Sequence, residues 1–208
     1  QKPFEKHLKV ETNRLYLNRE KRCADLLLDP TSYADTTNGS NWYSDSSTPL
    51  ADVMTAIEQI PPSMLGETKL VAVCGLELGN ALRRHPDLRG AGAENRTLEL
   101  ARIAELFGLD QLFVSNAIYN TAAAGQTVAK SRIWGTDKFA IFRVPTGEVT
   151  DEVGLFAATF RFNGDLEVRR WEEPSLGSKG SEAFQVSFAD DEKTVQNDMG
   201  HLLTGLAT

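Results

Sequence analysis

One long amphipathic helix limits what this chain can fold into. The stretch 12–30 (TNRLYLNREKRCADLLLDP) repeats apolar residues at steps of three and four, the spacing that aligns side chains on one helix face. The residues on this face are Leu15, Tyr16, Arg19, Cys23, Leu26 and Leu27. Arg22 can reach Asp25 one turn later, and Asp29-Pro30 ends the helix because proline denies the preceding residue helical angles. A helix of about 25 Å crosses most of a compact domain, so we predict a spine on which other elements pack.

Composition indicates a globular chain. Of 208 residues, 41% are hydrophobic and 25% are charged, and no run of eighteen apolar residues is present to span a membrane. The net charge of -7 argues against a protein whose main task is to grip nucleic-acid phosphates. No signal peptide is visible, and the start at Gln1 instead of methionine indicates a processed or truncated N-terminus.

The two cysteines do not form a disulfide framework. Cys23 and Cys74 each lie in an apolar periodic segment, which is typical of buried free thiols. Such thiols fit a reducing cytoplasm.

A polar loop and a second helix follow the spine. The stretch 31–47 is rich in Ser, Thr, Asn and Asp, so it predicts a loop, with Trp42 as its anchor. Thr48-Pro49 supplies an N-cap and a first-turn proline for a helix that Pro61-Pro62 closes. The apolar stripe of that helix is Leu50, Val53, Ile57 and Ile60.

Alternating short strands and helices then predict an α/β unit over residues 68 to about 150. The expected elements are a buried strand at 70–74 ended by Gly75, a helix at 77–85 stopped by Pro86, a helix at 100–107, a strand at 111–116 and a flexible small-residue loop at 121–130.

The last third predicts long strands. Alternating apolar residues on both sides of Asn163-Gly164 indicate a hairpin. A two-residue turn would pair Phe162 with Asp165, so we predict instead a three-residue loop, 163–165, with a bulge. The resulting pairs are Phe162–Leu166, Phe160–Val168 and Arg161–Glu167. A further strand is expected at 184–188, beyond a loop at 173–181, and a short element within 194–206.

One segment lies where a phosphate-binding loop would belong. The sequence GLELGN at 75–80 follows a strand and opens a helix, but it lacks the central glycine of a dinucleotide fingerprint and the Lys-Ser/Thr of a P-loop. We therefore interpret it as a structural turn.

The remaining polar residues do not form a reaction centre. His7, His85 and His201 are far apart in the sequence, so surface or capping roles are expected, with His85 favouring a helix C-terminus. Glu172 and Glu173 are adjacent and would point to opposite faces of an extended chain. The sequence thus predicts no enzyme: no catalytic, cofactor-binding or metal residue, and no cofactor.

Two basic clusters are candidate nucleic-acid contacts. Arg83-Arg84 and Arg169-Arg170-Trp171 are short, which is typical of solvated faces. Small-residue loops, a tryptophan loop and a long rod instead fit a self-assembling subunit, although many folds share them.

Five segments carry a family resemblance. They are RLYLNREKRCADLLLDPTSY (14–33), NGSNWYSDSSTPLADVMTAI (38–57), TKLVAVCGLELGNALRRHPDL (68–88), LARIAELFGLDQLFVSNA (100–117) and SRIWG (131–135). In this succession the chain resembles the major capsid proteins of tailed bacteriophages and prophages with the HK97-type fold. None of these segments is a catalytic signature.

The resemblance implies an α+β fold with a spine helix, a peripheral domain with long antiparallel strands, and an α/β axial domain. It places the peripheral domain at 1–62, the axial domain at 63–151, the peripheral strands at 152–193 and a C-terminal element, expected in the axial domain, at 194–208. Family members carry an N-terminal arm and a β-hairpin loop before the spine, where this sequence has only residues 1–11.

The resemblance further implies a structural protein, found in the virion and assembled in the bacterial host cytoplasm. Its partner is itself, as pentamers and hexamers of an icosahedral capsid that encloses double-stranded DNA through non-specific contacts. Scaffold, portal or decoration proteins are further expected partners, and no membrane is expected. The α/β unit would face the ring centre, with Arg83 and Arg84 as candidates for one ring contact.

Two alternatives are compatible with the same sequence. An encapsulin-type nanocompartment shell shares the fold and would enclose protein cargo. A small-molecule-binding α/β enzyme would use the turn at Gly75.

Overall fold

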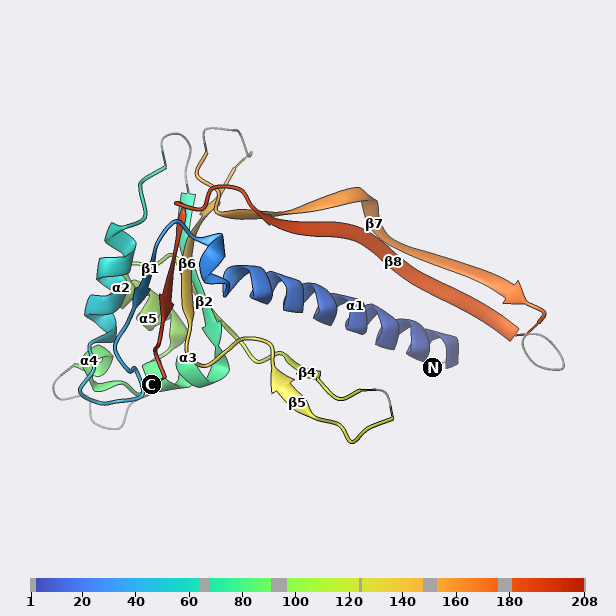
Figure 1. The fold of residues 1–208 in the computed structure, drawn as a ribbon, viewed down its shortest axis with the longest axis horizontal. Helices are drawn as coiled ribbons and strands as arrows, with labels where there is room; N and C mark the ends of the chain where they lie inside the picture. Colours follow the sequence, from blue (N-terminus) through green and yellow to red (C-terminus); the bar gives the residue numbers. More distant parts are fainter. Residues whose placement is uncertain are drawn as a thin grey trace.

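A sheet-and-helix body carries a long arm (Figure 1). The computed structural model describes residues 3–63, 68–90, 97–123, 125–147, 153–175 and 181–207. The helices are α1 (Pro3–Leu27), α2 (Pro49–Glu58), α3 (Leu76–Leu82), α4 (Pro86–Arg89) and α5 (Leu100–Phe107), with a 3₁₀ turn, η1 (Pro30–Ser32). The strands are β1 (Thr36–Asn38), β2 (Thr68–Gly75), β3 (Gln111–Ser115), β4 (Ile118–Asn120), β5 (Lys130–Arg132), β6 (Phe139–Pro145), β7 (Ala157–Glu173), β8 (Ser181–Thr194) and β9 (Gly200–Thr204).

The body is built on a mixed five-stranded sheet in the order β1-β9-β6-β2-β3. β2 lies antiparallel to β6 and parallel to β3, and β9 lies antiparallel to β6 and parallel to β1. The central strands are nearly continuous apolar runs, as expected for strands that are covered on both faces.

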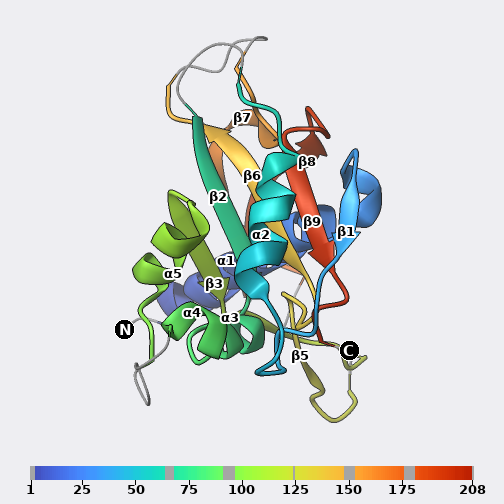
Figure 2. The same cartoon turned by 90° about the vertical axis from the view of Figure 1, so that its left-hand side faces the viewer.

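Helices α2 to α5 lie on one face of this sheet (Figure 2). Their apolar residues enclose Phe139 and Trp42, whose rings meet edge to face with centroids 5.2 Å apart. The opposite face packs on the C-terminal end of α1 and on the stacked rings of Tyr33 and Phe156, 4.5 Å apart. Both faces are therefore buried near the point where the arm begins.

The arm consists of α1 and the two-stranded ribbon β7–β8, with the α1 N-terminus near the ribbon tip (Figure 1). On the other side of α1 the short pair β4–β5 projects from the body. The predicted flexible loop 121–130 joins these two strands, and most of its described residues are exposed.

The predicted hairpin at Asn163-Gly164 is wrong. β7 continues through this site as one strand, and it pairs with β8, so that Phe160 lies opposite Asp191 and Phe162 opposite Ala189. Asn163-Gly164 falls within a register shift between Phe162 and Glu167. A bulge accommodates a turn-prone dipeptide in a two-stranded ribbon, and β8 offers seven further pairs beyond it.

The spine helix is confirmed, with two corrections. It begins at Pro3, earlier than the predicted residue 12, and it ends at Leu27, before Pro30. Arg22 does not bind Asp25 but forms ion pairs with β8; Lys21 is the partner of Asp25.

Local signals in the first half of the chain are confirmed. Thr48 is the N-cap residue of α2 and Pro49 its first residue, and Trp42 is completely buried. β1 and α2 pack with the sheet, in the same body as β2 and β3. The division into peripheral and axial domains stays a prediction.

Candidate functional site

The turn at Gly75 is filled by backbone. A Cβ atom at Gly75 would lie 2.2 Å from the carbonyl oxygen of Gly135 and 2.9 Å from that of Trp134. At Gly79, one turn into α3, a Cβ would lie 2.7 Å from a Val114 methyl carbon. These glycines therefore permit close packing of the chain around the start of α3.

His85 and His201 are buried, so neither is on the surface, but the expected capping role of His85 is confirmed. His85 accepts a hydrogen bond from the backbone N–H of Asp87 at the start of α4, so it caps a helix N-terminus, not a C-terminus. Its Nε2 lies 2.9 Å from Ser47 Oγ. His201 lies in β9, 2.9 Å from Thr37 Oγ1, and burial lowers its pKa. His7 is exposed on α1.

Both cysteines are free thiols, as predicted. Cys74 is buried in β2, and burial raises its pKa to about 12, so it is not a nucleophile near neutral pH. Cys23 is half-buried in α1, and burial is the main cause of its raised pKa. Within the described residues, no group of three or more His, Cys, Asp or Glu side chains could hold a metal ion.

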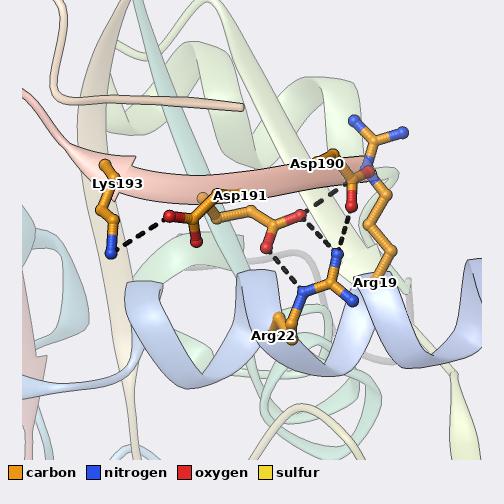
Figure 3. A network of polar contacts seen from close by, with 6 residues as sticks. Arg19, Arg22, Asp190, Asp191 and Lys193 are labelled. Atoms are coloured by element: carbon orange, nitrogen blue, oxygen red, sulfur yellow. Dashed lines mark hydrogen bonds and ion pairs between the residues drawn. The ribbon is translucent and has the colours of Figure 1, made fainter. Parts of the chain in front are cut away.

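Charged groups clamp α1 to β8 (Figure 3). Arg22 places Nε 2.8 Å from Glu192 Oε2 and Nη2 2.5 Å from Asp190 Oδ1. Arg19 Nε lies 3.3 Å from Asp190 Oδ2. The two carboxylates are almost fully buried, with side-chain exposures of 2% and 5%. The hydrogen bond to Glu192 is the main cause of the raised pKa of Arg22.

Aromatic pairs extend the same contact toward the arm tip. Tyr16 stacks on Phe188 with ring centroids 6.2 Å apart, and Phe4 meets Phe184 edge to face at 5.3 Å. Arg170 of β7 lies over the Phe4 ring, 4.7 Å from its centroid. Alternate β8 side chains therefore face α1, and we call this side of the ribbon its inner face.

The base of α1 is joined to the body by Glu20. Its Oε1 accepts hydrogen bonds from Ser115 Oγ at 2.7 Å and from Trp134 Nε1 at 2.9 Å. Lys138 also donates to the carbonyl of Leu28 at 2.9 Å. The helix is thus held both to the sheet and to the ribbon.

The opposite, outer face of the ribbon is uncovered in the single chain. Phe160, Phe162 and Trp171 are 57%, 73% and 43% exposed there. Glu167 and Arg169 form an ion pair with each other at 2.8 Å, and so do Asp191 and Lys193 at 3.2 Å. This face is the largest group of exposed aromatic side chains on one described element.

Sequence reasoning missed the clamp because it considered the helix alone. The signal was present in β8, where Asp190 and Glu192 continue the two-residue alternation of Phe184, Val186 and Phe188. Residues in phase on one strand share a face, so the acids had to lie where the phenylalanines lie. Arg169-Arg170-Trp171 is split by the same alternation, with Arg170 inward and its neighbours outward.

Solved structures define the class of fold. The chain is similar to a phage-related protein from Bordetella bronchiseptica RB50, with a TM-score of 0.78 and 22% identity over 96% of this chain and 66% of the other. It is also similar to a virus-like particle from Pyrococcus furiosus (TM-score 0.56, 13% identity, 91% and 63%) and to the capsid of cyanophage P-SCSP1u (TM-score 0.52, 13%, 96% and 65%). The chain has the α+β HK97-type capsid fold.

The sequence comparison is more specific. No family model matches the chain. Over 198 residues it is 27% identical to a protein named major capsid protein from Pseudomonas phage JBD67, covering 91% of this chain and 62% of that protein. The resemblance to phage major capsid proteins is therefore confirmed. The chain spans about three fifths of the length of this curated relative.

Proposed function

We propose that this chain is the structural subunit of the icosahedral capsid of a tailed phage or prophage. Its copies form pentamers and hexamers, and the closed shell encloses double-stranded DNA. The observation that carries this proposal is the likeness of 91% of the chain to a phage major capsid protein. The relatives carry capsid names, which favours a structural role over an enzymatic one.

The arm supports an assembling role on physical grounds. With 25 residues, α1 extends about 38 Å, and the ribbon accompanies it away from the body. A two-stranded ribbon is marginal by itself, and here α1 covers only its inner face. Exposed aromatic side chains on the other face are stabilised when a neighbouring subunit covers them.

We place the α/β unit, residues 63–151, at the ring centre and the spine and long strands, residues 1–62 and 152–193, at the periphery. A ring is a heterologous assembly, so each subunit offers two different complementary surfaces. Arg84 is exposed and suits one of them. Arg83 is half-buried and donates from Nε to the carbonyl of Leu98 at 2.9 Å, so its role includes holding the chain beside α3.

The proposed partners follow from the charge and the class. A net charge of -7 favours loose, non-specific contact with packaged DNA over tight binding. Scaffold, portal or decoration proteins are proposed as further partners, with assembly in the host cytoplasm. No membrane contact is proposed, and no described helix is long and apolar enough to cross one.

Electron microscopy of particles from the complete gene, expressed in bacteria, tests this function. We expect closed shells with five- and six-fold rings, containing nuclease-protected double-stranded DNA when phage packaging proteins are present. Shells that enclose a specific protein in place of DNA would identify a nanocompartment. Soluble monomers with a turnover that depends on the Gly75 turn would overturn the shell proposal.

A further inference from the structure

We propose that the outer face of the β7–β8 ribbon docks on the same face of a second copy of this chain, across a two-fold axis. This inference rests on the shell function proposed above and names a contact surface within it. The axis lies between the two ribbons and perpendicular to their strands. In this arrangement the end of one ribbon that joins the body (its root) lies over the free end (the tip) of the other ribbon. The β7 strands of the two copies then face each other.

The register of the ribbon identifies the side chains of this face. From root to tip, the β7 residues are Phe160, Phe162, Glu167, Arg169, Trp171 and Glu173. The β8 residues paired with them are Asp191, Ala189, Ser187, Gln185, Ala183 and Ser181. The odd β8 residues point away from α1 because the even ones contact it.

The four central β7 residues of this row are self-complementary, whereas at its two ends Phe160 would lie opposite Glu173. Reversing the row about its middle places Glu167 of one copy opposite Arg169 of the other, and Phe162 opposite Trp171. On β8 the same operation places Ser187 opposite Gln185 and Ala189 opposite Ala183. Glu167 thus meets Arg169 and Phe162 meets Trp171 when the same surface of two copies is joined. This use of one surface on both subunits defines an isologous contact. Because packed sheets are rotated by about 30°, the central pairs carry the contact.

The charges on the outer face of the ribbon favour a second copy of this chain as the partner. Arg169 and Lys193 are paired with Glu167 and Asp191 of their own strands at 2.8 and 3.2 Å. These cations are therefore neutralised, unlike those of a surface that binds nucleic-acid phosphates beside aromatic rings. A partner has to be apolar and locally neutral, as a second copy of the face is.

The size of the face sets the strength of the contact. Ten residue steps along β8 give a length of about 33 Å, and two strands give a width of about 10 Å, so each copy contributes about 330 Å². A stable pair needs about 800 Å² from each partner. The contact is consequently weak between free subunits, and it gains strength when many copies are held in one shell.

Disulfide trapping tests the contact in the full chain. A Phe162→Cys protein is mixed with a Trp171→Cys protein at high concentration under mild oxidation, and the cross-linked peptides are identified by mass spectrometry. We expect 162–171 links to exceed both 162–162 and 171–171 links, because only the first pair lies opposite across the axis. Val128→Cys, which is also exposed at 61% but lies on the β4–β5 loop, measures random collision.

Charge reversal at residues 167 and 169 is the decisive experiment. Glu167→Arg in both proteins places the introduced arginine of each copy opposite Arg169 of the other, and the 162–171 yield should fall about tenfold. Combining Glu167→Arg in one protein with Arg169→Glu in the other makes every cross pair opposite in charge, and the yield should return. Loss of the ion pair within each strand cannot produce this recovery, since both proteins lack it.

Three results would overturn the proposal: a 162–171 yield no higher than the Val128→Cys control, no recovery in the charge-reversed mixture, or links from residue 162 to another region of the second copy. Shells that assemble without 162–171 links would refute the ribbon contact alone. The 162–171 link without shells would refute the shell function alone.

Discussion

Removing the Arg22 side chain should weaken the attachment of α1 to β8. In Arg22→Met, the carboxylates of Asp190 and Glu192 lose their contacts at 2.5 and 2.8 Å and keep those to Arg19, at 3.3 and 3.8 Å. Methionine keeps an unbranched apolar side chain at this position, so the substitution mainly removes charge and hydrogen bonds.

The magnitude follows from the unequal burial of the partners. Breaking a buried ion pair costs about 3–5 kcal/mol, whereas an exposed pair contributes about 0–1 kcal/mol. The two acids are almost fully buried, but the Arg22 side chain is 45% exposed and remains screened by water. We therefore expect a loss of about 2 kcal/mol in the free energy of unfolding.

Arg14→Met is the matched control. Arg14 lies on the same helix and forms an ion pair with Glu11, but both side chains are exposed, at 68% and 43%. This variant should lose less than about 0.5 kcal/mol. Urea unfolding measures both variants, and amide hydrogen exchange should show lost protection in α1 for Arg22→Met only.

A double-mutant cycle with Glu192→Gln separates the pair from general damage. If Arg22 and Glu192 interact as the structure shows, the two substitutions should be coupled by about 1–2 kcal/mol. Equal unfolding energies for Arg22→Met and Arg14→Met, together with zero coupling, would refute the clamp.

Three further changes test the body of the protein. Burial raises the pKa of Cys74 from 9.0 to about 12, so above pH 9 the folded state keeps a thiol proton that the unfolded state loses. The free energy of unfolding should therefore fall with pH by up to about 1.4 kcal/mol per pH unit. Cys74→Ala should lack this contribution, and urea unfolding at several pH values compares the two proteins. Gly75→Ala should cost about 3 kcal/mol or prevent folding, because the added Cβ meets backbone oxygen. Gly147→Ala, whose new Cβ has no atom of the described residues within 4 Å, should be nearly neutral by thermal unfolding. Asp52→Ala should lower the free energy of unfolding by about 3 kcal/mol, because one carboxylate oxygen accepts hydrogen bonds from the Ser40 N–H, the Ser40 hydroxyl and the Trp42 indole. Trp42→Phe loses only the indole donor and should cost less.

Local sequence signals predicted the elements whose boundaries depend on nearby residues. Thr48-Pro49 started α2, and Pro30 followed the end of α1. Gly108, which follows α5, has a left-handed φ of 70°. The buried strand at 70–74 also needed only its own apolar run. Each of these signals acts within a few residues, so the sequence alone was sufficient.

The sheet order and the clamp depend on distant segments. β9 inserts between β1 and β6, which are far from it in sequence, and β1 has only three residues to announce a strand. Arg22 had a plausible partner within its own helix, yet Glu192, 170 residues away, is the one it binds. Backbone pairing and ion pairing of this kind are decided by tertiary packing, which single-sequence periodicity does not contain.

The bulge in β7 explains why the sequence resembles a hairpin. Between Phe162 and Glu167, β7 advances five residues while β8 advances two, from Ala189 to Ser187. The three extra residues of β7 equal the length of the loop that the sequence predicted at 163–165. Because three is odd, the bulge reverses the alternation of β7, so Trp171 shares the outer face with Phe162.

Deleting residues 163–165 therefore gives a last prediction. Both strands then advance two residues, so the distal pairs can form without a bulge and Trp171 should stay on the outer face. Acrylamide quenching of tryptophan fluorescence measures this, because Trp171 is 43% exposed whereas Trp42 and Trp134 are buried. We expect quenching close to that of the parent protein, and Trp171→Phe, which removes the accessible indole, sets the lower limit. A folded deletion variant with quenching at that limit would show that the distal ribbon pairs one residue out of register. The bulge would then be needed to set the register of the distal pairs.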